Sequence, residues 1–333
     1  MNPQKIKRSV QHLIDRKVPI FLWGPPGIGK SSIIAQIAKE KGIACIDLWL
    51  SLLDPTDLRG IPFFDSTNQT AIWAPASFLP DGSMKEGILF LDELNTAAPM
   101  VQASAYQLIL DRKIGEYKLP DGWAIVAAGN RESDRGVVFR MAAPLANRFI
   151  HLDMEVSVDD WRAWAISANL DLSIISFISY RPDTLFTFHT QSDTKAFATP
   201  RTWAYVNEIL QSNPEDDLLM PLISGAIGEE LASSFLGFKA VVKDLPDINK
   251  ILDGSEKSTP TDTSALHILC TALAIRVTED TRTKELENIL NYTLNLPGEF
   301  AVMVIQDLRQ RDISLDYLKS WSLWMKKFNT LLH

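Results

Sequence analysis

The stretch GPPGIGKS, residues 24–31, has the spacing G-x-x-x-x-G-K-[ST]. Glycines let the backbone curl so that its N–H groups face the oxygens of a phosphate. In such a loop the lysine reaches the β- and γ-phosphates of a nucleotide, and the serine hydroxyl binds Mg²⁺. The pattern therefore predicts a phosphate-binding loop, formed by Gly24, Pro25, Pro26, Gly27, Ile28, Gly29, Lys30, Ser31 and Ser32.

A pair of carboxylates ends the apolar stretch ILFLDE, residues 88–93. Asp92 is the expected partner of a Mg²⁺ ion, through the water shell of the metal, and Glu93 is expected to orient and deprotonate the attacking water. The alternative is that both acids simply stabilise the start of the following helix. A water-activating carboxylate favours hydrolysis over phosphate transfer. The sequence lacks the N-K-x-D signature of guanine specificity, so we expect ATP rather than GTP.

Three further polar residues follow buried or helical stretches. Asn130 ends the apolar stretch WAIVAAGN, where an amide can position the water or touch the γ-phosphate. Arg148 is expected to reach across a subunit boundary and neutralise charge in the transition state, with Arg140 as a less favoured competitor. Arg201 begins a later helix and is expected to sense the γ-phosphate within its own subunit. The structural alternatives are a turn residue for Asn130 and surface positions for both favoured arginines.

The elements that must position these residues alternate between buried strands and helices. Short apolar runs bounded by turn residues predict strands, and apolar spacing of three to four residues predicts helices. Gly42 is expected to end one helix. Such alternation indicates a parallel α/β sheet covered on both faces. We expect strands at 18–23, 43–50, 87–94, 123–130 and 149–155, and helices at 5–16, 30–42 and 98–112.

Two stretches interrupt this alternation. Residues 51–84 are rich in turn formers and too long for a bare loop, so they should contain a small hairpin or helix. Residues 111–123 alternate and then carry a Pro-Asp-Gly turn, which predicts a hairpin. We expect the aromatic residues of the first stretch to be buried against the core, and contact with a substrate is the alternative. These residues are Phe63, Phe64, Trp73 and Phe78.

The strand signal fades after residue 156. The following residues up to 243 are helical in pattern, residues 244–263 are polar and turn-rich and predict a linker, and residues 264–333 predict a C-terminal helical extension. Trp321 and Trp324 lie three residues apart on a predicted helix and are expected to pack in its core. The predicted nucleotide-binding domain thus occupies residues 1–155.

The composition limits the class of protein. The chain has 333 residues and a formal net charge of −8, which argues against a mainly nucleic-acid partner. Its two cysteines, Cys45 and Cys270, form no metal motif and fit a reducing cytoplasm. The five scattered histidines have no zinc-ligand spacing. No apolar run approaches the roughly 18 residues that span a bilayer. The first residues have no apolar block typical of a secretory signal.

Taken in this order, the residues resemble an AAA+ ATPase. Residues 24–31 match its Walker A motif, 88–93 its Walker B motif, Asn130 its sensor 1, Arg148 its arginine finger and Arg201 its sensor 2. The resemblance covers roughly residues 10–235. Finer features are similar to the MoxR branch of the dynein-related type. These are a helix-2 insert at 54–64, a hairpin before sensor 1 at 115–122, and the contexts ANRF and TPRTW.

The resemblance implies a P-loop NTPase fold with sheet order 5-1-4-3-2 and a C-terminal helical lid. It implies a hexameric ring that binds ATP and Mg²⁺ at subunit boundaries, with Arg148 supplied by the neighbour. MoxR-like rings remodel or activate a partner protein, commonly one with a von Willebrand factor A domain, and the two insertions would face the pore or this partner. The alternatives are a nucleic-acid motor or nuclease-partner NTPase and a non-hydrolysing scaffold, against which Glu93 weighs.

Overall fold

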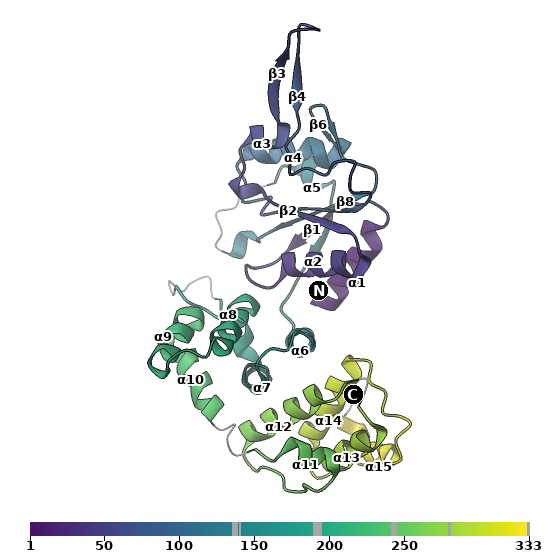
Figure 1. Ribbon diagram of the computed structural model, residues 1–333, viewed down its shortest axis with the longest axis vertical. Helices are drawn as coiled ribbons and strands as arrows, with labels where there is room; N and C mark the ends of the chain where they lie inside the picture. Colours follow the sequence, from purple (N-terminus) through teal and green to yellow (C-terminus); the bar gives the residue numbers. More distant parts are fainter. Residues whose placement is uncertain (135–138, 140, 189–194, 241–244, 279–280, 332–333) are drawn as a thin grey trace. The chain divides into compact units, whose positions relative to one another are not determined.

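The computed structural model describes the chain except residues 135–138, 140, 189–194, 241–244, 279–280 and 332–333. The chain divides into two compact units, Met1–Ser157 and Val158–His333. The first is an α/β unit and the second is helical (Figure 1). No helix among the described residues combines the length and the apolar character needed to cross a membrane.

The first unit is built on five parallel strands in the order β2-β5-β8-β1-β9. Numbered along the chain as first to fifth, the strands have the predicted order 5-1-4-3-2. All of β8 is buried, and so is β5 except for its last residue, as expected for the middle of a sheet covered on both faces. The strands are β1 Ile20–Trp23, β2 Ala44–Trp49, β5 Gly87–Asp92, β8 Trp123–Gly129 and β9 Ile150–Asp153.

Helices lie on both sides of this sheet. Helices α1 (Pro3–Ile14) and α2 (Lys30–Lys41) lie on one side, and α4 (Pro99–Asp111) and α5 (Ala143–Ala146) on the other (Figure 1). The side chain of Asn2 caps α1 by accepting from the backbone N–H of Lys5, at 3.1 Å. Gly42 ends α2 in the left-handed conformation, with φ 67°, as the sequence predicts. A short 3-10 turn, Glu132–Asp134, follows β8.

The stretch predicted to hold a small hairpin or helix holds both. It contains the 3-10 turn Leu50–Leu52, helix α3 (Pro55–Arg59), and the antiparallel strands β3 (Ile61–Asp65) and β4 (Thr70–Ala74). Gly60 joins the helix to the hairpin with φ 86°, and a Cβ there would lie 2.0 Å from the carbonyl oxygen of Ala74. Only glycine therefore fits where the helix turns into the ribbon.

The prediction that the aromatic residues of this stretch are buried is wrong for two of them. Phe63 is 59% exposed and Phe64 is 72% exposed, whereas Trp73 and Phe78 are half-buried, and Phe78 packs against the core of the unit. The reason is that β3 and β4 form a two-stranded ribbon, and such a ribbon has no further layer to cover its faces. Ile61 and Ile72 on the same hairpin are also exposed.

The second predicted hairpin is present, but its turn lies elsewhere. Strands β6 (Lys113–Ile114) and β7 (Tyr117–Lys118) are joined at Gly115, which adopts φ 57°. The Pro-Asp-Gly sequence follows β7 and leads into β8 instead. Glycine at the two-residue loop satisfies the positive φ that a tight hairpin requires, so the strands close there first.

The second unit consists of helices. The residues predicted as a linker contain α11, which buries Ile251 and Leu252 in the C-terminal core. Asp247 caps this helix, accepting from the backbone N–H of Asn249, and Gly254 ends it at φ 83°. The unit contains α6 Val158–Ser167, α7 Leu172–Tyr180, the 3-10 turn Pro182–Leu185, α8 Pro200–Gln211, α9 Asp216–Ile227, α10 Glu229–Ala240, α11 Ile248–Asp253, α12 Thr263–Arg276, α13 Thr283–Thr293, α14 Gly298–Gln310, α15 Trp321–Phe328 and the 3-10 turn Asn329–Leu331.

Trp324 is fully buried, as predicted, and donates to Thr293 Oγ1 at 3.1 Å. Trp321 stacks on it with ring centroids 5.4 Å apart, and the Arg309 guanidinium lies 5.0 Å from the Trp321 ring. Trp321 is only half-buried, so it closes the edge of the C-terminal core rather than lying within it.

A buried ion pair joins two distant helices of the second unit. Arg162 on α6 donates to Asp307 on α14 at 2.6 Å, and both side chains are buried. Burial raises the pKa of Asp307 to about 6 against the opposing pull of Arg162. Burial, and then the charge of Arg162, lower the pKa of His267 to about 4. The charges of this cluster are therefore matched inside the fold.

Candidate nucleotide-binding site

The loop after β1 has the backbone conformation that a phosphate-binding turn requires. Gly27 and Gly29 adopt φ 78° and φ 99°, in the left-handed region that favours glycine. Gly29 is the N-cap residue of α2, so the unpaired N–H groups of the first turn face the loop. The open amino end of a helix and its dipole both attract a phosphate group.

Lys30 is the first residue of α2, and only 9% of it is exposed. Its Nζ donates to the carbonyl oxygens of Gly24 at 2.7 Å and Pro25 at 3.1 Å, and to Asn130 Oδ1 at 3.0 Å. Two backbone oxygens of the loop and one amide at the end of β8 thus hold the ammonium group over the loop. A γ-phosphate bound in this turn would meet this ammonium group.

Ser31 and Asp92 bring a hydroxyl and a carboxylate together. Ser31 Oγ donates to Asp92 Oδ2 at 2.9 Å, and Asp92 ends β5 beside the loop. Oxygen ligands of this kind suit Mg²⁺, which keeps several waters and takes one or two protein groups plus phosphate oxygens. The residues present therefore fit Mg²⁺. No group of three or more His, Cys, Asp or Glu side chains that could hold a metal occurs in the described parts of the chain.

Glu93 follows Asp92 in a conformation uncommon for a residue with a side chain. Its φ is 56°, in the left-handed region, and such strain is usually retained at functional positions. Ser51 donates a hydrogen bond to Glu93 Oε2. The Glu93 backbone N–H also donates to Asp92 Oδ1 at 2.8 Å. Ser51, in the turn after β2, therefore orients the carboxylate of Glu93, while the backbone of Glu93 holds the carboxylate of Asp92.

Asn130 is held at the end of β8 by a second asparagine. Asn95 is 2% exposed, and its Nδ2 donates to the backbone oxygen of Asn130 at 2.7 Å. Gly129 makes room for this contact, because a Cβ there would lie 2.1 Å from Asn95 Oδ1. The amide that contacts Lys30 is thus positioned by packing that only glycine permits.

Arg148 lies away from these residues within its own chain. It precedes β9, where Ile150 pairs with Ile20 at the amino end of β1 and Asp153 pairs with Trp23 at the carboxyl end. Lys30, Asp92, Glu93 and Asn130 all follow the carboxyl ends of strands. The four residues of β9 span about 13 Å, at roughly 3.3 Å per residue. Arg148 is exposed, and its guanidinium has no hydrogen bond or ion pair with any part of the chain that the structure describes.

Arg201 belongs to the second unit and lies in the first turn of α8, where it is exposed. The N-cap Thr199 accepts from the backbone N–H of Thr202 at 3.1 Å. A cation near the positive end of a helix is unfavourable, which is consistent with a role other than helix stability. Arg140 lies outside the described residues.

Sequence reasoning missed two residues of this site, Ser51 and Asn95. Both are small polar residues just after a strand or its terminal acids, in WLSLL and LDELN. Their position just beyond the carboxyl end of a predicted buried strand is the feature of the sequence that could have indicated them. Their partners lie 42 and 35 residues away along the chain, which only the sheet order brings together.

Comparison with known proteins shows what the first unit is similar to. Residues 19–149 match the model of the AAA domain of the dynein-related subfamily. Midasin of Giardia intestinalis is 28% identical over 169 residues, which are 48% of this chain and 3% of midasin. The chain therefore spans only a small part of that relative's length. The match to the AAA domain covers the loop, both carboxylates, Asn130 and Arg148.

Solved structures are similar to the chain only at low identity and low TM-score. The Thermotoga maritima RuvB Holliday junction branch migration motor is 19% identical with a TM-score of 0.40, over 86% of this chain and 87% of that one. NtrX from Brucella abortus in complex with ATP is 13% identical with a TM-score of 0.39, over 93% of this chain and 67% of that one. The sheet order and the loop geometry above describe the fold more closely than these likenesses do.

Proposed function

We propose that this chain is an ATPase that hydrolyses ATP to ADP and phosphate, with Mg²⁺ as its cofactor. The observation that carries the proposal is the convergence at one end of the sheet of Lys30, Ser31 with Asp92, Glu93 and Asn130. The match to the dynein-related AAA domain supports it. Residues 24–32 would hold the nucleotide, with the loop N–H groups on its phosphates.

Each residue has one task in this proposal. Lys30 binds the β- and γ-phosphates, and Ser31 and Asp92 hold the metal. Mg²⁺, when bound, neutralises developing charge on the phosphate oxygens. Glu93 orients the attacking water and accepts its proton, while Ser51 fixes the carboxylate. Asn130 holds Lys30 and is within reach of the γ-phosphate. Nucleotide binding and water activation thus come from one chain.

The proposed active site is completed by a second copy. Arg148 lies at the amino end of β9, so it serves a neighbour's nucleotide more readily than its own. This arrangement supports a ring, and we propose the hexamer of the MoxR-like branch. Arg201 would sense the γ-phosphate from the second unit. Lys30, Arg148 and Arg201 would all contact the γ-phosphate, from the first unit, the neighbouring subunit and the second unit. Hydrolysis removes the charge of this phosphate, so the second unit and the neighbouring subunit can rotate.

The work done by this rotation is proposed to be chaperone-like remodelling or activation of a partner protein, with a von Willebrand factor A domain protein as the candidate class. The hairpin β3–β4 supports a protein client over nucleic acid. It exposes Ile61, Phe63, Phe64 and Ile72, and residues 61–74 contain no lysine or arginine to meet phosphates. Both cysteines are free thiols, which supports a cytoplasmic location.

A Glu93→Gln chain tests the ATPase proposal. We expect it to bind ATP with wild-type affinity and to lose turnover about 10²–10⁴-fold, the range for a general base. Phosphate release and binding of a fluorescent ATP analogue are measured, with the exposed Glu86→Gln as the matched control. Wild-type turnover in the Glu93→Gln chain, or no ATP binding by the wild-type chain, would contradict the proposal.

The same variant tests the client class. With ATP bound it should retain its client, so proteins that co-purify with Glu93→Gln but not with a Glu93→Gln/Phe63→Ala/Phe64→Ala chain are candidates. A purified von Willebrand factor A domain protein recovered this way supports the proposal. Turnover of the wild-type chain that rises with single- or double-stranded DNA and not with protein would instead favour the nucleic-acid motor.

A further inference from the structure

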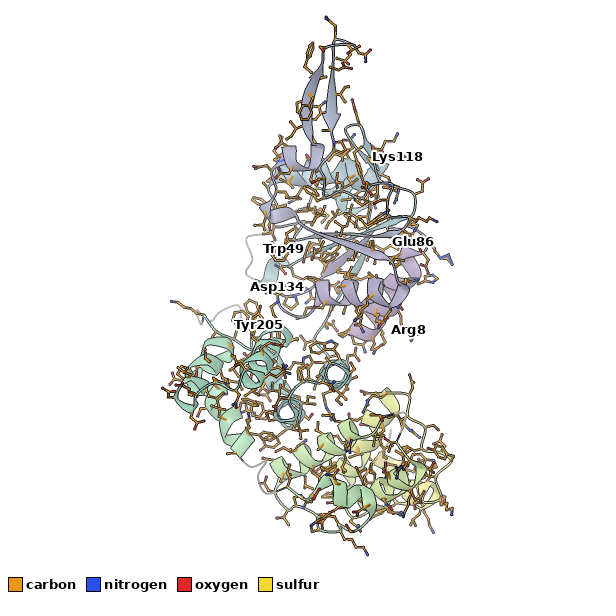
Figure 2. All side chains as sticks on the ribbon, viewed as in Figure 1. Arg8, Trp49, Glu86, Lys118, Asp134 and Tyr205 are labelled. Atoms are coloured by element: carbon orange, nitrogen blue, oxygen red, sulfur yellow. The ribbon has the colours of Figure 1, made fainter. Side chains whose placement is uncertain are left out.

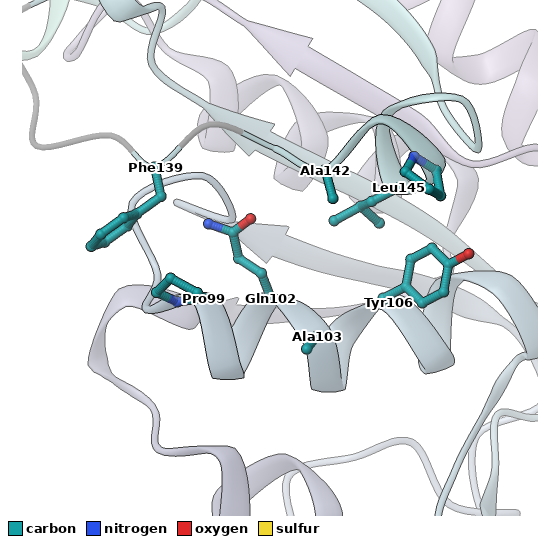
Figure 3. A pocket seen from close by; sticks show the side chains of 8 residues that line it. Pro99, Gln102, Ala103, Tyr106, Phe139, Ala142 and Leu145 are labelled. Atoms are coloured by element: carbon teal, nitrogen blue, oxygen red, sulfur yellow. The ribbon is translucent and has the colours of Figure 1, made fainter.

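An apolar pocket of about 380 Å³ lies between α4 and the segment leading into α5 (Figure 3). Its walls include Pro99, Gln102, Ala103, Tyr106, Phe139 and Leu145. The Phe139 backbone N–H donates to the backbone oxygen of Asn95 at 2.7 Å, which ties the pocket to the site. Leu145 lies one helical turn before Arg148, and the backbone N–H of Arg148 donates to the Leu145 oxygen at 3.0 Å. The pocket therefore borders the arginine.

A pair of apolar side chains projects beside the carboxylates. Trp49, which Figure 2 labels, is 56% exposed. Leu52 is 73% exposed, while Leu50 between them is fully buried and anchors the turn. Trp49 pairs in register with Asp92, and Ser51 donates to Glu93. We call Trp49 and Leu52 the apolar projection. It borders the part of the proposed active site that contains Asp92 and Glu93, to which Arg148 would be supplied by another copy.

The pocket and the apolar projection lie at different places on the first unit. The projection ends β2, one edge strand, and the pocket adjoins the segment that enters β9, the other edge strand. Two such features at different places on one unit suit a head-to-tail contact between copies, which closes into a ring when the rotation allows. The same contact would bring Arg148 of one copy toward Glu93 of the next.

The charges at the two places are complementary. Asp47, Asp92 and Glu93 gather beside the apolar projection, because Asp47 lies two residues before Trp49 on β2 and Asp92 pairs in register with Trp49. The segment 141–151 beside the pocket carries Arg148 and no carboxylate. The apolar projection is thus surrounded by acidic residues, and the pocket lies beside a basic residue. Such complementary charges favour one docking orientation between two copies.

We propose that Trp49 and Leu52 of one copy of this chain insert into the α4–α5 pocket of the next copy, and that this contact delivers Arg148 to the neighbour's active site. This inference rests on the proposed ATPase function and names the surfaces that build its shared site. A buried tryptophan surrounded by apolar contacts is a frequent anchor of protein interfaces.

Two variants test the contact from its two sides. Trp49→Ala removes the anchor, and Ala103→Trp fills the pocket from an exposed position on α4. Each should raise the protein concentration needed for half-maximal assembly and turnover by about 10–30-fold, as loss of a central anchor does. Binding of a fluorescent ATP analogue to dilute protein should stay as in wild type. Tyr317→Ala and Ala168→Trp, at exposed positions of the second unit, are the matched controls.

Mixing the two variants gives the decisive result. A Trp49→Ala chain keeps its pocket, and an Ala103→Trp chain keeps its projection, so the mixture should recover one good contact and part of its turnover at concentrations where each alone is inactive. Wild-type assembly by either variant, or a mixture no more active than its components, would overturn the proposal.

A cross-link provides a measurement that does not depend on turnover. In a Cys45→Ser background, a Leu52→Cys/Ala103→Cys chain should form disulfide-linked dimers and higher multimers, and a Leu52→Cys/Lys118→Cys chain should not. Equal cross-linking of the two chains would overturn the contact. If the wild-type chain itself hydrolyses no ATP, the proposed function fails; if it does so with concentration dependence and these variants behave like wild type, only the contact is wrong.

Discussion

The two units bury a cation to the same degree and use it differently. Lys30 in the first unit is 9% exposed, and Arg162 in the second is 8% exposed. Arg162 on α6 meets the carboxylate of Asp307 on α14, so its charge is matched within the fold. Lys30 is held at the open end of a sheet by loop carbonyls and an amide, in a loop shaped for phosphate. The charge of Arg162 therefore stabilises the fold, whereas the charge of Lys30 is positioned to bind a ligand.

Arg148 provides the largest test of this contrast, because it is a cation that the described chain leaves exposed. Arg148→Ala should lower turnover by about 10³–10⁵-fold, the range for an arginine that stabilises transferring phosphate, with ATP affinity unchanged. Mixing Arg148→Ala with Glu93→Gln chains should restore activity, since one composite site then has both groups. Arg8→Ala, an exposed arginine on α1, is the control for phosphate release. Normal turnover by Arg148→Ala would exclude this residue.

The next largest effect is expected from replacement of the buried Arg162. Arg162→Met should lower the free energy of unfolding by about 3–5 kcal/mol, because it leaves Asp307 buried without its partner. The double variant Arg162→Met/Asp307→Leu should recover most of that stability. Urea unfolding followed by circular dichroism measures both. Equal stability of the single variant and wild type would show that this pair is not matched as tightly as its 2.6 Å distance indicates.

Lys30→Met should behave in the opposite way. We expect turnover to fall by about 10²–10³-fold, as when one preorganised donor is removed from an active site. The free energy of unfolding should change by no more than about 2 kcal/mol, the range for the loss of hydrogen bonds such as those to Gly24, Pro25 and Asn130. Phosphate release and urea unfolding are measured on the same protein. A large loss of stability with normal turnover would erase the contrast between the two cations.

The pH dependence of stability separates the two titrating groups of the second unit. The pKa of Asp307, raised to about 6, makes stability fall as pH rises from about 4 to 6. The pKa of His267, lowered to about 4, makes stability rise between about pH 4 and 6.5. These slopes oppose each other in wild type. Relative to wild type, Asp307→Asn should therefore gain stability with rising pH and His267→Gln should lose it, by about 1–3 kcal/mol over the window. Urea unfolding at several pH values measures both, and parallel curves for the two variants would contradict the prediction.

The smallest expected effect is at Ser51. Ser51→Ala removes the hydrogen bond that orients Glu93, and one such bond to a charged group corresponds to about a tenfold loss of turnover. ATP affinity should not change, because the hydrogen bond that is lost holds Glu93 and not the phosphate-binding loop. Ser77→Ala, at an exposed position outside the site, serves as the control. A change in ATP affinity without a change in turnover would assign Ser51 to binding instead.

Much of the first unit follows from local sequence patterns. The five strands are short apolar runs, and their buried positions made them recognisable before their order was known. The loop and its carboxylates were found because glycine, lysine and acidic residues have few substitutes at such positions. Gly42 ended a helix where the apolar spacing stopped. In each case the physical cause acts over a few neighbouring residues.

Other features depended on contacts that no local pattern contains. Phe63 and Phe64 look like core residues, but a two-stranded ribbon has nothing to bury them against. Residues 248–253 look like part of a linker, yet Ile251 and Leu252 find a core made by later helices. Gly115 closes the second hairpin before the Pro-Asp-Gly sequence can. Ser51 and Asn95 gain their importance only from strand order.

Gly129 limits how this sequence can change over generations. Its missing side chain is the space that Asn95 fills, so replacement of the glycine by any larger residue would force the asparagine to move and release the backbone of Asn130. Neither position can drift while the other is kept. Descendants of this chain that differ at residue 129 should therefore differ at residue 95 too, as a linked pair of substitutions.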